Sequence, residues 1–379
     1  MLARNYADFV ESFKAIEDPR QDEKILYPLD EVLFMVFVGV LCCQENWPDI
    51  IDFCEYRLHI LRRYFPYEHG LPSISTLMRV IGLIKASCIE AWLSTHAMNM
   101  VETLSDEQIV LDGKSLRGKR KFSHSSKNTH ILNVFASHLG LVLAQKAIPE
   151  KSGEIRAIKE VLEHADLDGA VVSIDAIGCQ KNIANKIHEQ GGQYFLALKN
   201  NQKTLITDVE YLFTKPELFS DQYDEVDSGH GRIESRKCTV IRDIAWLKAE
   251  HPGWNKLTSL VRVISTRIIG DNSSETVKYY ISSEASDAKT LAARARRHWS
   301  IENNLHWILD VQFGEDGCCI RKDNAAENMS AVRKMVINVV KKYKEKNKLT
   351  LSPQKLRKSC AWTEDRMIAI LDSWFYSCS

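Results

Sequence analysis

The sequence predicts an α/β protein: a mixed β-sheet flanked by helices, with an all-helical N-terminal domain and a β-rich insertion. Three observations support this. Apolar residues recur at spacings of three and four through the first hundred residues, short apolar runs alternate with amphipathic stretches from residue 106, and a β-rich segment precedes a final helix. The predicted boundaries are 1–103 for the helical domain, 104–203 and 287–345 for the two parts of the sheet domain, 204–286 for the insertion and 346–379 for a C-terminal tail.

The N-terminal domain is predicted from three apolar-periodic stretches, at 27–42, 47–65 and 75–104, separated by prolines and by a Gly-Leu-Pro-Ser turn. Ser73 or Ser75 is a suitable N-cap for the third stretch. A turn followed by a helix that carries Arg79 is compatible with a DNA-reading helix-turn-helix, and equally with a plain helical bundle.

The sheet domain is predicted from five apolar runs, two of which end on an acidic residue. The expected strands are 107–118, 129–139, 140–148, 169–178 and 193–199, with helices at 154–167 and 181–192. Three antiparallel strands followed by helical crossovers to two more strands is the connectivity of an RNase H-like sheet.

Composition describes a globular chain without a membrane span. Hydrophobic residues make up 45% and charged residues 26% of the 379 residues. The most apolar stretch, 32–43, is about half of the ~20 residues that a spanning helix needs. The ten cysteines contain no CxxC pair, so we expect reduced thiols and a cytoplasmic protein.

Charge is neutral overall but unevenly distributed. Residues 291–358 hold 15 Lys and Arg against 7 Asp and Glu, and residues 111–127 hold six against one. Such clusters on a neutral protein predict a positively charged groove for nucleic acid. The predicted DNA contacts in the first cluster are Lys114, Arg117, Lys119 and Arg120.

The two acids that end strands are Asp112 and Asp175. Their strands are neighbours in this topology, so the carboxylates should meet at one edge of the sheet. Two such groups about 4 Å apart repel by roughly 4 kcal/mol at an effective dielectric constant of 20. The sequence therefore predicts bound hard cations, Mg²⁺ or Mn²⁺, and with a third carboxylate a site for two ions.

The third carboxylate is sought in the stretch HWSIENNLHWILDVQFGED, residues 298–316. On a helical period His298, Glu302, His306 and Asp310 lie near one stripe, beside an apolar face. Glu302 is well placed to be the third ligand if this face packs on the sheet. The alternative is a zinc site made by His298, Glu302 and His306.

Two further features have alternative interpretations. In the stretch 228–236, His230, Arg232 and Arg236 share one face if the backbone is extended, either as DNA-phosphate contacts or as part of an ion-pair ladder. Trp299 and Trp307 are expected in the core, with stacking on a flipped base as the alternative.

Four motifs together resemble one protein family. VLDGKSLRG, SIDAIGCQ, SGHGRIESR and the 298–316 stretch, in this order, resemble the H-repeat-associated (ISAs-type) transposases of bacterial insertion sequences, members of the DDE superfamily. The resemblance covers nearly the whole chain. It implies that Asp112, Asp175 and Glu302 are the catalytic and metal-binding acids.

The resemblance also implies a function. A transposase of this kind cleaves double-stranded DNA at transposon ends and joins the freed 3′-hydroxyl to target DNA, with two Mg²⁺ or Mn²⁺ ions, as a homodimer at the bacterial nucleoid. The alternatives are a domesticated DNA-binding protein without catalysis and a metal-dependent nuclease without strand transfer.

The chain departs from the family pattern around the glutamate. Related transposases commonly carry a tyrosine, an arginine and a lysine there, and the corresponding residues are Ala295, His298 and Leu309. The basic contact is therefore assigned to Arg296 or Arg297.

Overall fold

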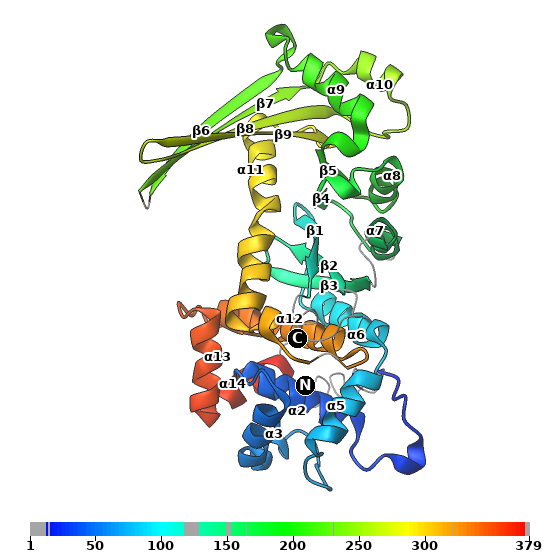
Figure 1. The fold of residues 1–379 in the computed structure, drawn as a ribbon, viewed down its shortest axis with the longest axis vertical. Coiled ribbons are helices and arrows are strands. Elements are labelled where there is room, and N and C mark those ends of the chain that lie inside the picture. The colour runs from blue at the N-terminus through cyan, green and yellow to red at the C-terminus, as the bar shows by residue number, and fades with distance from the viewer. Residues whose placement is uncertain are drawn as a thin grey trace.

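The computed structural model describes residues 13, 16–116, 129–148, 153–163, 165–229, 231–320 and 322–375. Helices from the two ends of the chain form one end of an elongated molecule, and a long sheet extends from them to the other end (Figure 1). Among the described residues, no helix combines the length and the apolar character needed to span a bilayer.

The N-terminal helices are α2 (Leu29–Leu41), α3 (Trp47–Tyr56), α4 (Leu58–Leu61), α5 (Ile74–Leu83) and α6 (Ala86–Asn99). Helix α2 is apolar on nearly every side and almost entirely buried, which makes it the centre of this layer. Ser73 is the N-cap of α5, as predicted: its hydroxyl accepts a hydrogen bond from the backbone N–H of Thr76.

The first five strands are β1 (Gln108–Ser115), β2 (His130–Ala136), β3 (Leu141–Ile148), β4 (Val171–Ile174) and β5 (Gln193–Leu198), connected through α7 (Glu154–Glu163) and α8 (Lys181–Glu189). Their order in space is β3-β2-β1-β4-β5. Strands β1, β4 and β5 are parallel, and β2 is antiparallel to both neighbours. The predicted RNase H-like sheet is thereby confirmed.

The insertion continues this sheet instead of forming a separate body. Helix α9 (Lys203–Leu212) is followed by β6 (Asp221–Gly229), β7 (Arg232–Ile241), the short α10 (Ala245–Glu250), β8 (Ser259–Ile269) and β9 (Asn272–Ser282). Strand β9 pairs with β5, which produces one sheet of nine strands in the order β3-β2-β1-β4-β5-β9-β8-β7-β6. The far ends of β6–β9 project beyond the rest of the molecule (Figure 1).

The last part of the chain returns to the sheet and then to the N-terminal helices. Helix α11 (Ala288–His298) packs beneath the insertion strands, and α12 (Ala325–Lys346) crosses β3 beside α6. The expected C-terminal tail contains two helices, α13 (Pro353–Trp362) and α14 (Glu364–Phe375). Their buried side chains Leu356, Met367 and Leu371 belong to the same apolar cluster as the N-terminal helices.

Candidate active site

Two neighbouring parallel strands carry Asp112 and Asp175 to one place on the sheet. Leu111 in β1 pairs with Ile174 in β4, and each acid is the next residue along its strand direction. Asp175 is also held by its own backbone, since its Oδ1 accepts a hydrogen bond of 3.0 Å from the N–H of Ile177. The predicted meeting of these two acids follows directly from the strand register.

Glu302 reaches Asp112 from the segment that follows α11. One ligand atom each from Asp112, Glu302 and His306 lie within 4.8 Å of one another. His306 Nδ1 is 3.2 Å from Glu302 Oε2 and 3.7 Å from Asp112 Oδ2, and Asn133 Nδ2 lies 3.3 Å from the other ring nitrogen. Glu302 is more than half exposed, whereas His306 is buried.

The carboxylates of the cluster repel one another. Burial, followed by the negative charges of Glu302 and Asp175, raises the pKa of Asp112 to about 7. Burial lowers the pKa of His306, against the opposing effect of Glu302. The site thus has a deficit of positive charge, and a bound cation would relieve the repulsion.

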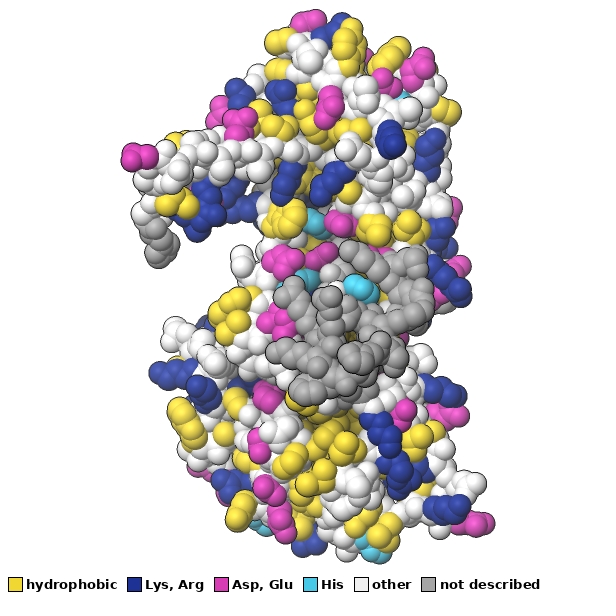
Figure 2. Space-filling model, viewed as in Figure 1, with side chains coloured by type: hydrophobic (Ala, Val, Ile, Leu, Met, Phe, Trp, Pro, Cys, Tyr) yellow, Lys and Arg dark blue, Asp and Glu magenta, His cyan; other side chains and the backbone are white. Residues whose placement is uncertain are grey.

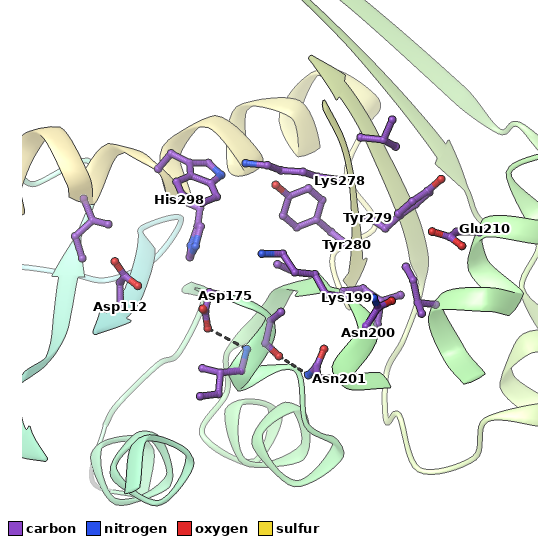
Figure 3. Close-up of a pocket in the computed structure, with 18 of the residues that line it drawn as sticks. Asp112, Asp175, Lys199, Asn200, Asn201, Glu210, Lys278, Tyr279, Tyr280 and His298 are labelled. Carbon is purple, nitrogen blue, oxygen red and sulfur yellow. Dashed lines mark hydrogen bonds between the residues drawn. The ribbon is translucent and has the colours of Figure 1, made fainter. Parts of the chain in front are cut away.

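The acids line one end of a cleft of about 810 Å³ (Figure 3). Its walls come from β1, the turn that follows β4, β5, β9, α9 and α11, so a strand of the insertion completes a cavity that the core strands begin. Lys199, Lys278 and Trp299 also line this cleft. Neither lysine was predicted as a site residue, and Trp299 was expected in the core, with base stacking as the alternative. One sequence signal could have identified the two lysines as site residues: each stands close to the buried part of a strand, Lys199 after β5 and Lys278 within β9.

The segment 298–316 is not the continuous α-helix that its periodicity predicts. Its backbone forms wide π-helical turns over Glu302–His306 and Ile308–Gln312. His298 is buried against Ser173, with 3.2 Å between Nδ1 and Oγ, and so lies apart from the Glu302–His306 pair. This placement does not support the alternative zinc site, which needed His298.

The expectation that the two tryptophans are core residues is wrong. Trp299 is 46% and Trp307 52% exposed, while Leu305 and Leu309 of the same segment are fully buried. The apolar stripe is narrower than the sequence suggested, because the wide turns rotate successive side chains differently from an α-helix.

Lys114 does not belong to a DNA-facing surface. Its side chain is 7% exposed, and its Nζ lies 2.6 Å from Asp310, 3.1 Å from Glu315 and 3.4 Å from Asp316. Ion pairs with these three acids, which all follow Glu302 in the sequence, stabilise the buried ammonium group. The prediction of Lys114 as a DNA contact is therefore corrected to a role inside the fold.

The arginines of the insertion form an ion-pair ladder on the face of the sheet that meets α11. Arg236 pairs with Glu225 and Glu234, at 3.1 and 2.6 Å, and Arg232 pairs with Glu234 at 3.0 Å. Arg296 of α11 reaches Glu225 at 3.4 Å. Arg232 and Arg236 share one face, as predicted. Of the two interpretations offered for that face, their contacts in the structure match the ion-pair ladder.

These arginines border a hollow. In Figure 2, Lys and Arg side chains gather on the side of the projecting strands that faces a recess in the molecule. Arg297 is partly buried, and burial followed by the charge of Arg294 lowers its pKa. Predicted DNA contacts that lie outside the described residues are Arg117, Lys119, Arg120 and His230.

The fold and this acidic cleft together define a class, the RNase H-like proteins with acids gathered at the sheet edge. The chain belongs to the transposase DDE domain family, whose model matches residues 103–339. A second model, described as associated with that domain, matches residues 10–97. The resemblance seen in the sequence motifs is thus confirmed over most of the chain.

Curated relatives agree with this assignment. The chain is 36% identical over 345 residues to the H repeat-associated putative transposase YhhI of Escherichia coli strain K12, which covers 87% of this chain and 89% of the relative. The putative protein YbfL of the same strain matches with the same identity and coverage. The putative transposase YncI of Escherichia coli O157:H7 is 34% identical over 91% of this chain and 89% of its own length.

Proposed function

We propose that this member of the transposase family hydrolyses a phosphodiester at transposon ends and transfers the freed 3′-hydroxyl into target DNA. The observation that carries the proposal is the gathering of Asp112, Asp175 and Glu302 at one cleft from three different elements, with the pKa of Asp112 raised to about 7 by burial and by the other two acids. Acids held together against their repulsion are typical of a site prepared for cations.

The donor atoms fit Mg²⁺ or Mn²⁺. Asp112, Asp175 and Glu302 offer carboxylate oxygens, the ligands that hard divalent cations prefer, and His306 adds a nitrogen that Mn²⁺ tolerates better than Mg²⁺. Two such ions bound by the three acids would activate the attacking oxygen and stabilise the leaving oxygen at phosphorus.

The side chains of the chain itself prepare this chemistry. Asp175 is oriented by the Ile177 N–H, and Asp112 by its place in β1, so both acids keep their positions without a ligand. Glu302 is more exposed and can adjust to substrate. Asn133 is fully buried and contacts the ring nitrogen of His306 that faces away from Glu302, which holds the imidazole beside the acids.

Double-stranded DNA is the proposed substrate, and two copies of the chain acting on two transposon ends are the proposed assembly, in the bacterial cytoplasm at the nucleoid. The hollow under β6–β9 is bordered by arginines whose acidic partners are only partly buried, so DNA phosphates can replace them. Arg296 and Arg297 lie in the last turn of α11, just before the segment that carries Glu302, and are the proposed basic contacts there.

The decisive experiment uses Asp175→Asn. Asparagine preserves the cap on Ile177 but removes the charge, so the fold should persist while metal-dependent nicking falls by about 100-fold or more. The substrate is a labelled duplex carrying the element's own ends, incubated with Mg²⁺ or with EDTA. Asp243→Asn, an exposed acid outside the cleft, is the matched control and should keep wild-type activity.

Two other results of this experiment would each favour a different function. Tight binding to these ends by the wild-type protein without any metal-dependent nick would replace the proposal with a domesticated DNA-binding protein. Nicking without joining would indicate a nuclease that lacks strand transfer.

A further inference from the structure

The cleft continues beyond the acids to a pair of lysines. Leu198 of β5 pairs with Tyr279 of β9, so the antiparallel register, continued by one residue, sets Lys199 opposite Lys278. Both side chains line the cleft, and Figure 3 shows them on the wall between the acids and Glu210. Two cations from strands far apart in the chain therefore meet at one place.

Neither lysine has an acidic partner among the described residues: no carboxylate of that part of the chain lies within ion-pair distance of either ammonium group. By contrast, Lys114 and Arg296 each have a carboxylate partner, Asp310 and Glu225 respectively. Burial, followed by the charge of Lys199, lowers the pKa of Lys278. The pair is thus a concentration of positive charge that the protein does not neutralise.

The position of Lys278 is fixed by aromatic neighbours. Its Nζ lies 3.7 Å from the centre of the Trp299 ring, a close cation–π contact. Tyr280, which lines the same cleft, stacks on Phe195 with 4.6 Å between ring centres. This arrangement explains why a half-exposed tryptophan stands at the cleft: it supports the lysine.

We propose that Lys199 and Lys278 form a phosphate subsite that binds the backbone phosphate next to the scissile phosphodiester. This inference rests on the proposed function, since it places the scissile bond at the acids. A DNA strand is a chain of anions, so a strand that passes the acids must place a neighbouring phosphate along the same cleft. Lysine is a suitable point charge for such a phosphate.

The first test measures how DNA binding depends on salt. Lys199→Gln and Lys278→Gln are compared with Lys248→Gln, an exposed lysine on α10 outside the cleft. The probe is the labelled duplex that carries the element's own end, in EDTA to prevent cleavage. Each cleft variant should bind the duplex about tenfold more weakly. The negative slope of log K against log salt should become less steep by about 0.9. The Lys248 variant should keep the wild-type slope.

The second test identifies the contacted phosphate. A series of duplexes carries one uncharged methylphosphonate linkage at successive positions around the cleavage point. The wild-type protein should lose about tenfold in affinity when the linkage beside the scissile one is neutral, and the Lys199→Gln/Lys278→Gln double variant should lose nothing further there. If the lysines only stabilised the fold, the lysine substitutions and the neutral linkage would weaken binding independently, at this position as at any other. Lys278→Arg should restore binding to the unmodified duplex.

The outcomes separate this inference from the proposed function. If the wild-type protein binds and nicks DNA but the lysine variants keep its salt slope and its methylphosphonate profile, the subsite is wrong and the transposase proposal stands. If the wild-type protein neither binds nor nicks the duplex, both are wrong. Lys199 is exposed, so its variant supports the test even if the more buried Lys278 variant unfolds.

Discussion

Asp112 occupies an unfavourable position for an isolated carboxylate. It is largely buried, and the charges of Glu302 and Asp175 add to the effect of burial in raising its pKa to about 7. At pH 8 the group is ionised and its repulsion opposes folding. Under the proposed function, cations held by the three acids would make the same arrangement favourable, at a cost in stability when no cation is bound.

Replacing this acid should stabilise the metal-free protein. We expect Asp112→Asn to raise the free energy of unfolding by roughly 1–3 kcal/mol at pH 8 in EDTA, because the repulsion disappears while the shape is kept. Denaturant unfolding measures the difference. Asp271→Asn, an exposed acid in the β8–β9 turn, should change little. A variant less stable than the wild-type protein would show that Asp112 has a stabilising partner.

Lys334 is a second charged residue in an unfavourable place. It is fully buried in α12, where its Nζ donates hydrogen bonds to Gln145 Oε1 at 2.6 Å and to Ser330 Oγ at 2.9 Å. Burial lowers its pKa to about 7, and the negative charge of Glu315 opposes that shift only in part. Between pH 7 and about 10.4, the value in unfolded chains, the unfolded state therefore binds more protons than the folded state.

Stability linked to this lysine should rise with pH in that window. Above the folded pKa the buried amine is neutral and its burial costs less, so the unfolding free energy of the wild-type protein minus that of Lys334→Met should increase from pH 7 to pH 9.5. Urea unfolding at both pH values gives the comparison. Lys346→Met, exposed in the last turn of the same helix, should show no such trend. An equal difference at both pH values would mean that Lys334 stays charged throughout.

At the scale of elements, the segment after α11 shows how backbone geometry selects site residues. A regular helix would align His298, Glu302, His306 and Asp310. His298, the last residue of α11, instead contacts Ser173, and the π-helical turns that follow place Glu302 and His306 beside Asp112 and Asp310 beside Lys114. Periodicity identified the segment and its polar residues, but only the packed backbone determined which of them face the acids.

The β6–β7 ladder leads to a prediction about DNA binding. Glu234 contacts Arg232, Arg236 and Arg267, the last at 3.8 Å, so Glu234→Gln should make Arg232 and Arg267 available to phosphates and leave Arg236 paired with Glu225 alone. We expect tighter DNA binding and a steeper salt dependence, with a change in unfolding free energy below about 1 kcal/mol because the pairs are partly exposed.

Electrophoretic shifts over a range of salt concentrations measure this effect. Glu275→Gln is the control: it makes the same change of charge on exposed β9, and no ion pair of Glu275 is seen among the described residues. If Glu234→Gln and the wild-type protein bind DNA with equal affinity, these arginines have only a structural role.

At the scale of the whole molecule, the two ends of the chain share one core. The apolar cluster that contains α2 also contains side chains of the Glu302 segment, α12, α13 and α14. Arg357 of α13 is completely buried and donates hydrogen bonds to the carbonyl of Val40 at 2.6 Å and of Gln312 at 2.7 Å. The C-terminal helices therefore support both the N-terminal layer and the segment that carries Glu302.

Removing these helices should prevent stable folding. Truncation after Asn347 deletes Leu356, Met367, Ile370 and Leu371, all fully buried, and each such side chain contributes about 1.5–3 kcal/mol. Their sum is comparable to the ~5–15 kcal/mol that stabilises a typical domain. We expect an insoluble or partly unfolded product by circular dichroism. Trp362→Ala, at a residue of α13 that is 69% exposed, should leave the melting temperature nearly unchanged; a truncated protein that melts like the full chain would refute the shared core.

Local patterns in the sequence determined the order of the core strands, and hence the meeting of Asp112 and Asp175. Each strand is a short apolar run that its own residues specify, and parallel pairing then brings successive residues of β1 and β4 together. The N-terminal helices were likewise readable from their periodicity. Strand β6 was not, because its exposed polar residues lack the apolar alternation of a half-buried strand.

Tertiary structure alone decided which charged residues face the cleft. Lys114 follows the buried run of β1 by three residues, and its burial depends on acids more than 190 positions away in the sequence. Lys199 and Lys278 become neighbours only when β9 pairs with β5. Burial, ion pairing and cation–π contact depend on what surrounds a side chain after folding. These surroundings come from long-range pairing, which no local period encodes.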